Sequence, residues 1–101
     1  FLEQVRENGE YLRWQLEKLL PVCPEIVSLR GRGLMLGLDL GIGAQPVIES
    51  CAENGLLVCK AGDQTLRLVP PLIVERPHID EAVRILKLAF QTVRDSHVKK
   101  S

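Results

Sequence analysis

The segment from Ala61 to Val74 constrains the fold more than any other part of the chain. Its turn pair, Gly62-Asp63, separates two short runs with strand composition, Leu56–Lys60 and Leu66–Val69. The pair Pro70-Pro71 follows at once and removes two backbone donors, so the second strand must stop there. We therefore expect a β-hairpin whose second strand ends open to a neighbour or a ligand.

Arg67 is the only charged residue in the second of these strands. Side chains alternate along a strand, so Leu66 and Leu68 share one face and Arg67 points to the other. A planar guanidinium fixed on a rigid strand is suited to binding a carboxylate with two hydrogen bonds. The alternative is an arginine that extends into solvent or pairs with a nearby acidic residue. The residues alone leave both alternatives open.

The first half of the chain predicts a helix followed by two strands. Residues 1–20 carry an apolar stripe at helical spacing, made of Leu2, Val5, Leu12, Leu16, Leu19 and Leu20. Strands are expected at 25–29 and 34–40, and the second has leucine at every even position. Between them, the segment Arg30-Gly-Arg-Gly33 predicts a tight turn or a bulge with positive φ. The two strands most simply form an antiparallel pair.

The second half predicts a short helix, the hairpin and a long last helix. The short helix spans 46–54, ends at Gly55, and buries Val47, Ile48, Cys51 and Ala52. The last helix has Pro77 in its first turn. Its core face is Ile79, Val83, Leu86, Phe90 and Val93, widened by Ile85 and Leu88. The expected fold is a single α+β domain of order α-β-β-α-β-β-α, with helices packed on a mainly antiparallel four-stranded sheet.

The glycine-rich segment Gly41–Pro46 follows an expected strand and precedes an expected helix, which is the position of a phosphate-binding loop. It matches only the first two glycines of G-x-G-x-x-G and has Pro46 in the third position. It also lacks the Gly-Lys-Ser/Thr sequence of a Walker loop. The segment favours a simple strand-to-helix turn.

Composition excludes several classes of partner. The 101 residues include 13 Lys plus Arg and 13 Asp plus Glu, so no net field attracts nucleic acid or an anionic membrane. No apolar run approaches the ~20 residues of a membrane span. The three cysteines, Cys23, Cys51 and Cys59, are odd in number and lack C-x-x-C spacing. This argues against a disulfide framework or a structural zinc site and favours a cytoplasmic location. We expect no nucleic-acid or membrane partner.

Two blocks of sequence carry a family resemblance. They are Arg30-Gly-Arg-Gly-Leu-Met-Leu-Gly-Leu-Asp-Leu40 and the stretch from Gly55-Leu-Leu-Val to Leu66-Arg-Leu-Val-Pro-Pro-Leu72. In this order and spacing they resemble the C-terminal small domain of class III, pyridoxal-phosphate-dependent aminotransferases of fold type I. The segment Leu66-Arg-Leu-Val-Pro-Pro-Leu72 is most similar to the acetylornithine aminotransferases. Ornithine and 4-aminobutyrate aminotransferases share a less exact form of it. The resemblance covers nearly the whole chain.

The resemblance implies a role for Arg67 and none for the other arginines. In this family the matching arginine binds a carboxylate of the amino-acid or 2-oxo-acid substrate, so Arg67 is expected to do so. The Arg-Gly-x-Gly-Leu-Met block is mainly structural, so Arg30 and Arg32 inherit no chemical role. Lys60 does not match the lysine that forms the Schiff base, which belongs to the family's large domain. The fragment is therefore expected to contain no catalytic and no cofactor-binding residue.

The expected function follows from that resemblance. The parent protein would hold pyridoxal 5'-phosphate in a large domain, act as a homodimer, and transfer an amino group from N-acetylornithine or a related ω-amino substrate to 2-oxoglutarate. A first helix without a capping residue fits a piece of a longer chain, and residues 1–101 alone would be inactive and bind no cofactor. Two alternatives remain: a stand-alone carboxylate-binding module, and a structural domain whose Arg67 pairs internally.

Overall fold

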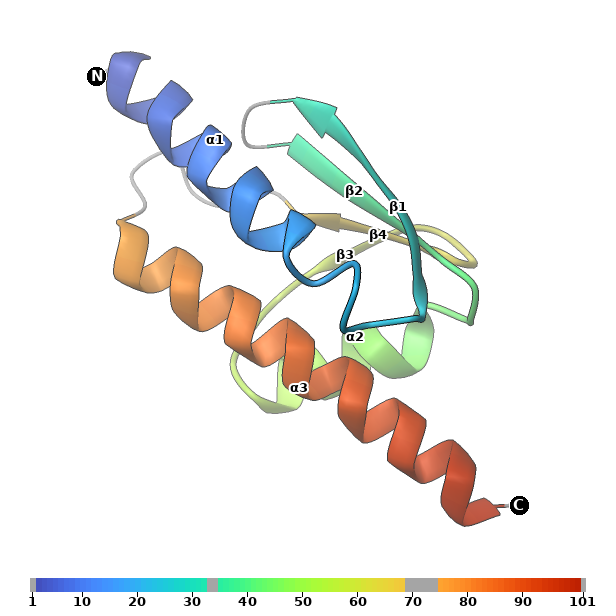
Figure 1. The fold of residues 1–101 in the computed structure, drawn as a ribbon. Coiled ribbons are helices and arrows are strands. Elements are labelled where there is room, and N and C mark those ends of the chain that lie inside the picture. The colour runs from blue at the N-terminus through green and yellow to red at the C-terminus, as the bar shows by residue number, and fades with distance from the viewer. Residues whose placement is uncertain (1, 33–34, 69–74, 101) are drawn as a thin grey trace.

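The computed structural model describes residues 2–32, 35–68 and 75–100. Predictions that concern Gly33, Leu34 and Val69–Val74 lie outside these ranges. The elements follow the predicted order (Figure 1), as α1 (Leu2–Glu17), β1 (Ile26–Arg32), β2 (Met35–Leu40), α2 (Gln45–Glu53), β3 (Cys59–Gly62), β4 (Thr65–Leu68) and α3 (Arg76–Lys100). The α+β class and the α-β-β-α-β-β-α order are therefore confirmed.

The four strands form one antiparallel sheet in the spatial order β1-β2-β4-β3. The register places Arg30 opposite Gly37, Gly37 opposite Arg67, and Arg67 opposite Cys59. These four residues form one row across all the strands. Side chains in such a row project from the same face of a sheet, so the register decides which residues meet Arg67.

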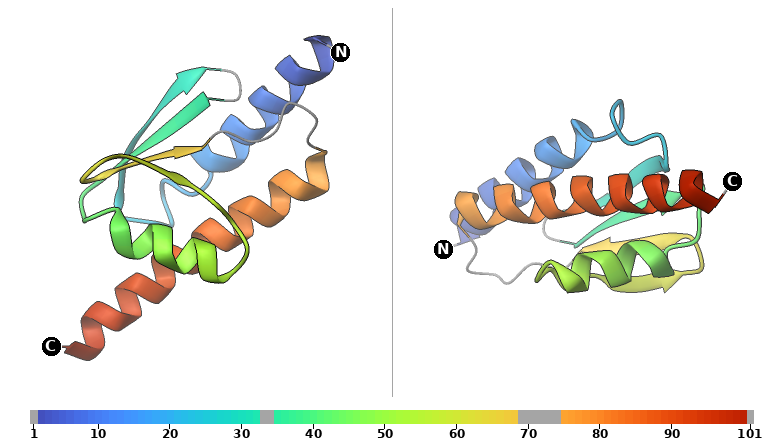
Figure 2. Two further views of the ribbon diagram at one scale, coloured as in Figure 1. Left: turned by 180° about the vertical axis from the view of Figure 1, so that it is seen from behind. Right: turned by 90° about the horizontal axis from the view of Figure 1, so that it is seen from below.

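The helices cover one face of this sheet and leave the other open. Figures 1 and 2 show α1 and α3 side by side over the sheet, with α2 packed against α3. The leucines of the covered face, Leu36, Leu38 and Leu66, are 0% exposed. Leu16 of α1 and Phe90 of α3 are equally buried. On the opposite face the side chains of Arg30, Met35 and Arg67 are exposed. The predicted alternation, with the leucines on one face and Arg67 on the other, is therefore confirmed.

The first strand is longer than predicted, and the predicted turn begins too early. β1 continues through Arg32, with Gly31 opposite Leu36 and Arg32 opposite Met35. A positive φ was expected in this segment and occurs at Gly31, at 112°. A Cβ on Gly31 would lie 2.3 Å from the carbonyl oxygen of Met35. Pairing with β2 therefore extends the strand through residues whose composition indicates a turn.

The third strand was predicted three residues too early. Leu56 N–H donates to the carbonyl oxygen of Cys51 at 2.8 Å, which ties this residue to the end of α2. β3 therefore begins at Cys59 and runs through Gly62, and the hairpin turn is at Asp63 and Gln64. Because β3 pairs with the short β4, the register of this hairpin determines the first and last residues of β3.

Three predicted helix features are also wrong in detail. α1 ends at Glu17, three residues before the predicted end. In α2 Ser50 is buried and Ala52 is exposed, because Ala52 is one residue beyond Cys51 and so turns away from the buried face. In α3 Leu88 is 40% exposed, because it lies two residues after the buried Leu86 and points to the opposite side of the helix.

The cysteine side chains differ in exposure. Cys23 and Cys51 are buried, Cys59 is exposed, and all three are free thiols. Burial raises the pKa of Cys51 to about 11 and also raises that of Cys23. Within the described ranges, no group of three His, Cys, Asp or Glu side chains has an arrangement suited to a metal ion. In the same ranges, no helix is long and apolar enough to span a bilayer.

Candidate functional site

Arg67 lies on the open face of the sheet, in the strand between β2 and β3. Its Cα is opposite that of Gly37 on one side and that of Cys59 on the other. The side chain is exposed, and within the described part of the chain it forms no hydrogen bond or ion pair. No acidic residue of the described ranges pairs with Arg67, so of the alternative stated above only an arginine that extends into solvent still stands. Its guanidinium remains available to an external anion.

The nearest acidic residue on this face, Asp39, is already fully engaged. Arg30 approaches it with two nitrogens, Nε to Oδ2 at 2.9 Å and Nη2 to Oδ1 at 2.9 Å. Ser28 Oγ donates to Oδ2 at 2.8 Å, and Thr65 Oγ1 donates to Oδ1 at 3.1 Å. Asp39 Oδ1 thus accepts two hydrogen bonds, and Oδ2 accepts one and lies against Nε of Arg30 in the ion pair. Asp39 neutralises Arg30 and leaves the charge of Arg67 uncompensated.

These contacts keep Asp39 ionised. The hydrogen bond from Ser28 is the largest cause that lowers the pKa of Asp39, and those from Thr65 and Arg30 lower it further. Desolvation opposes them in part. A fixed carboxylate with a lowered pKa is a stable partner for Arg30 at neutral pH. The guanidinium of Arg30 is therefore held in one place on the open face.

A hollow of about 360 Å³ lies between the two arginines. Its lining consists of Arg30, Gly31, Met35, Leu36, Gly37, Ala61, Thr65 and Arg67. Neighbouring strands are about 4.8 Å apart, so the Cα atoms of Arg30 and Arg67 are separated by roughly 10 Å, with Gly37 between them. A carboxylate above Gly37 would be within reach of both guanidinium groups. This is the candidate site.

A second hollow, of about 570 Å³, lies beside the Gly41–Pro46 turn. Its arginine, Arg94, is bound to Glu25 through two hydrogen bonds of 2.7 and 2.8 Å. These bonds are the main cause of the lowered pKa of Glu25. The backbone N–H groups of Gly41 and Ala44 donate to the carbonyl oxygens of Glu25 and Asp63, both at 2.8 Å. These two donors are engaged within the protein, and the segment is a strand-to-helix turn between β2 and α2, as predicted.

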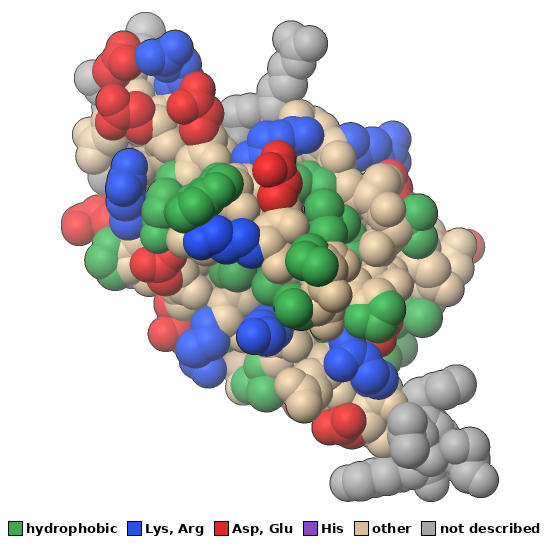
Figure 3. All heavy atoms as spheres, viewed as in Figure 1, with side chains coloured by type: hydrophobic (Ala, Val, Ile, Leu, Met, Phe, Trp, Pro, Cys, Tyr) green, Lys and Arg blue, Asp and Glu red, His purple; other side chains and the backbone are tan. Residues whose placement is uncertain are grey.

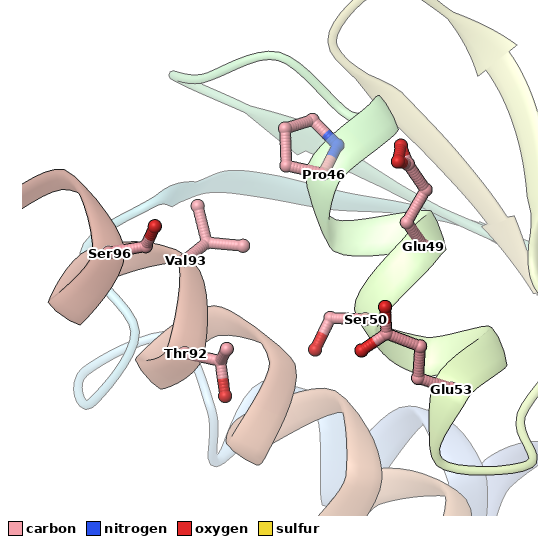
Figure 4. Close-up of a pocket in the computed structure, with 7 residues that line it drawn as sticks. All are labelled: Pro46, Glu49, Ser50, Glu53, Thr92, Val93 and Ser96. Carbon is pink, nitrogen blue, oxygen red and sulfur yellow. The ribbon is translucent and has the colours of Figure 1, made fainter.

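A third hollow, of about 360 Å³, lies between α2 and α3. Figure 4 shows its lining, which comprises Pro46, Glu49, Ser50, Glu53, Thr92, Val93 and Ser96. Two carboxylates and no cation line this groove, so it would repel a carboxylate ligand. Of the three hollows, only the one on the open face of the sheet has a cation without a partner.

The attraction of the site for an anion is local. The formal net charge of the chain is +0, and Figure 3 shows acidic and basic side chains interspersed over the face that carries the helices. No broad positive field would therefore concentrate anions at the protein. Recognition depends on the geometry of Arg67 and its surroundings.

Comparison with known families decides the class of protein. The sequence profile described as "Aminotransferase class-III" matches residues 1–90. The chain belongs to the class-III aminotransferase family. The chain is 40% identical over 91 residues to the acetylornithine aminotransferase of Listeria innocua, and the match covers 90% of the chain and 24% of that relative. It is also 40% identical over 88 residues to the ornithine aminotransferase of Staphylococcus carnosus, covering 87% of the chain and 22% of the relative.

A solved structure agrees with these matches. The lysine aminotransferase of M. tuberculosis has a TM-score of 0.84 and 33% sequence identity, over 90% of this chain and 22% of that one. The chain thus spans about a quarter of the length of the relatives it matches. The family profile, over residues 1–90, covers α1, the sheet, α2 and the first part of α3, and the predicted family membership is confirmed.

Class-III aminotransferases generally use pyridoxal phosphate, and the described residues do not fit that group. In the Gly41–Pro46 turn the backbone N–H groups of Gly41 and Ala44 are already engaged by carbonyl oxygens. Lys60 is at the sheet edge, where its Nζ is 3.6 Å from Asp63 Oδ1. Lys18 lies over the ring of Trp14, with Nζ 3.5 Å from the centroid. No step of the chemistry is therefore assigned to these side chains.

The sequence located Arg67 but missed the residues around it. The leucine alternation of β2 leaves Asp39 on the other face, but the contacts of Asp39 with Arg30 and Thr65 were not predicted. The relevant signal was the presence of Gly37 and Asp39 at alternate positions of an otherwise apolar strand. Interpreting that signal requires the strand order, because Thr65 meets Asp39 only when β4 lies beside β2.

Proposed function

We propose that the chain is the substrate-side, C-terminal small domain of a pyridoxal-phosphate-dependent aminotransferase. The reaction would transfer an amino group from N-acetylornithine, or a related ω-amino substrate, to 2-oxoglutarate. Family membership supports the reaction class, and the names of the relatives with about 40% identity support this group of substrates. That N-acetylornithine is the amino donor within this group of substrates is part of the proposal.

The observation that carries the proposal is the unpaired Arg67 on an open sheet face. Its neighbour Asp39 is committed to Arg30, so the guanidinium of Arg67 keeps its full charge for a ligand. Both substrates of the proposed reaction carry carboxylates, and a guanidinium binds a carboxylate through two parallel hydrogen bonds. Fixing that end of the substrate would orient its amine or carbonyl group for reaction.

The remaining functions would lie elsewhere in a longer protein. Pyridoxal 5'-phosphate, bound by a large domain, would supply the electron sink for amino transfer, and this domain would supply positioning. We further propose a homodimeric and cytoplasmic parent, and that residues 1–101 alone have no transaminase activity. The coverage of only 24% of the acetylornithine aminotransferase relative supports this division of labour.

A stand-alone carboxylate-binding module is the second candidate. One observation favours it: the hollow and its unpaired arginine are formed entirely by residues of this chain. Such a module would bind an amino acid or a 2-oxo acid without any catalysis. It would require the natural gene product to be no longer than the present sequence.

The test combines a mass measurement with an amino-donor panel. The natural gene product would be purified, its intact mass measured, and its transaminase activity assayed with 2-oxoglutarate. The donors would be N-acetylornithine, ornithine, succinylornithine and 4-aminobutyrate. We expect a protein about four times longer than this chain, with N-acetylornithine giving the highest kcat/KM. A gene product of this length that binds carboxylates without transamination would favour the module instead.

A further inference from the structure

We propose that Gly37 determines access to the carboxylate site, because its missing side chain forms the floor on which a substrate carboxylate lies between Arg67 and Arg30. This inference rests on the proposed function and adds a specificity-determining residue to it. It also assigns Asp39 a positioning role, since that residue holds Arg30 at the second wall of the hollow. The ligand class is a small acyclic acid, with a carboxylate at the end that enters the hollow.

The cross-strand row is the first part of the argument. Arg30, Gly37 and Arg67 are consecutive members of one row on the open face. A side chain at position 37 would project from that face into the space between the two arginines. Any group larger than hydrogen would therefore occupy the place where a carboxylate can contact both guanidinium groups.

The fold itself does not require glycine at position 37. A Cβ there would be 3.7 Å from the carbonyl oxygen of Leu66 and 3.9 Å from Cγ of Arg30, which are ordinary van der Waals distances. Gly37 is also not among the glycines with positive φ, which are Gly31 and Gly55 in the described ranges. Gly31, by contrast, is required by both its φ and the 2.3 Å approach to Met35 O.

A glycine that the backbone does not need is unfavourable inside a strand. Glycine weakens strands because it loses more conformational freedom on folding and packs no side chain. It is found in strand interiors where a ligand or another backbone approaches closely. At Gly37 the structure provides the space for such an approach, and Arg67 provides the charge that would attract a ligand to it.

Arg30 can contribute although Asp39 neutralises it. A guanidinium has five N–H donors. Asp39 engages Nε and Nη2 of Arg30, so donors remain for a second acceptor on the exposed side of the group. The ion pair thus restricts the orientation of Arg30, while Arg67 supplies the uncompensated charge. A carboxylate above Gly37 would receive hydrogen bonds from one fixed and one adaptable guanidinium.

The test uses the natural gene product and glutarate, a dicarboxylate with neither an oxo nor an amino group. Gly37→Ala and Gly37→Val would be compared with Gly43→Ala, whose Cβ would meet nothing within 4 Å. The dissociation constant of glutarate would be measured by calorimetry, and KM and kcat for 2-oxoglutarate by steady-state kinetics. Thermal unfolding would be recorded for every variant.

We expect Gly37→Ala to weaken glutarate binding by about tenfold and Gly37→Val by about a hundredfold. This range corresponds to the loss of charge-assisted hydrogen bonds between the carboxylate and the guanidinium groups. KM for 2-oxoglutarate should rise in parallel, with kcat at saturation within about twofold of the parent protein. Tm should not fall, because alanine and valine suit a strand better than glycine. Gly43→Ala should leave the glutarate dissociation constant unchanged.

The outcomes separate this inference from the proposed function. If Arg67→Lys weakens glutarate binding and Gly37→Ala does not, the role of Gly37 is overturned while the role of Arg67 stands. If Arg67→Lys leaves both the glutarate dissociation constant and KM unchanged, the proposed function itself fails. If neither Gly37 variant folds, glycine is a requirement of the fold, and the inference is overturned.

Discussion

Replacement of Arg67 by glutamine tests the difference between a structural and a ligand-binding arginine. The guanidinium is exposed and has no partner among the described residues, so its removal should change the free energy of unfolding by less than about 0.5 kcal/mol. Substrate binding should respond strongly. Hydrogen bonds to charged groups contribute about 1.5–3 kcal/mol each, so loss of one corresponds to a roughly 10- to 150-fold lower kcat/KM.

Arg67→Lys should be intermediate, because lysine keeps the charge but cannot form the parallel pair of hydrogen bonds. The matched control is Arg84→Gln, which removes an exposed arginine of α3 whose ion pair with Glu81 lies within one helix turn. That variant should leave kcat/KM unchanged. The assay is steady-state kinetics with 2-oxoglutarate as the varied substrate, together with urea unfolding. A kcat/KM unchanged in Arg67→Gln, or lowered equally in Arg84→Gln, would refute the reasoning.

Other predictions concern the core and the ion pairs. Leu38→Ala should lower the free energy of unfolding by about 2–5 kcal/mol in urea, because Leu38 is 0% exposed, whereas Met35→Ala should change it by less than about 0.5 kcal/mol. The pKa of Asp39 is lowered in the fold, so its contribution is present above the unfolded pKa of about 3.9 and is lost as pH falls further. Asp39→Asn should therefore flatten the acid loss of stability between about pH 5 and 2, and an unaltered profile would count against the cluster. Arg94→Gln should lower Tm at neutral pH, because Glu25 is largely buried and would lose its partner. A Tm equal to that of the parent protein would show that this ion pair contributes nothing to stability.

Much of the fold was predictable because the strongest sequence signals are local. The leucines at 36, 38 and 40 can share a face only in a strand, and the apolar stripes of α1 and α3 repeat at helical spacing. Strand limits were less predictable, since they depend on the partner strand. β1 continues through Arg32 because β2 pairs with it, and β3 starts at Cys59 because Leu56 is bonded to the end of α2.

At the site, too, local sequence signals were predictable and contacts between strands were not. Alternation along β4 was enough to place Arg67 on the face opposite Leu66 and Leu68. The contacts of Asp39 were not predictable, because Thr65 is 26 residues away and reaches it only through the strand order β1-β2-β4-β3. Consequently the sequence indicated which arginine is suited to bind a carboxylate, and the structure showed why that arginine remains unpaired.

A crystal structure of the natural gene product with bound glutarate would test the role of this domain most directly. We predict a carboxylate above Gly37, with its oxygens about 2.7–2.9 Å from the guanidinium nitrogens of Arg67. Arg30 should keep its two contacts with Asp39 in that complex. A carboxylate bound elsewhere, with Arg67 extended into solvent or paired with an acidic residue, would contradict the proposed role of this domain in substrate recognition.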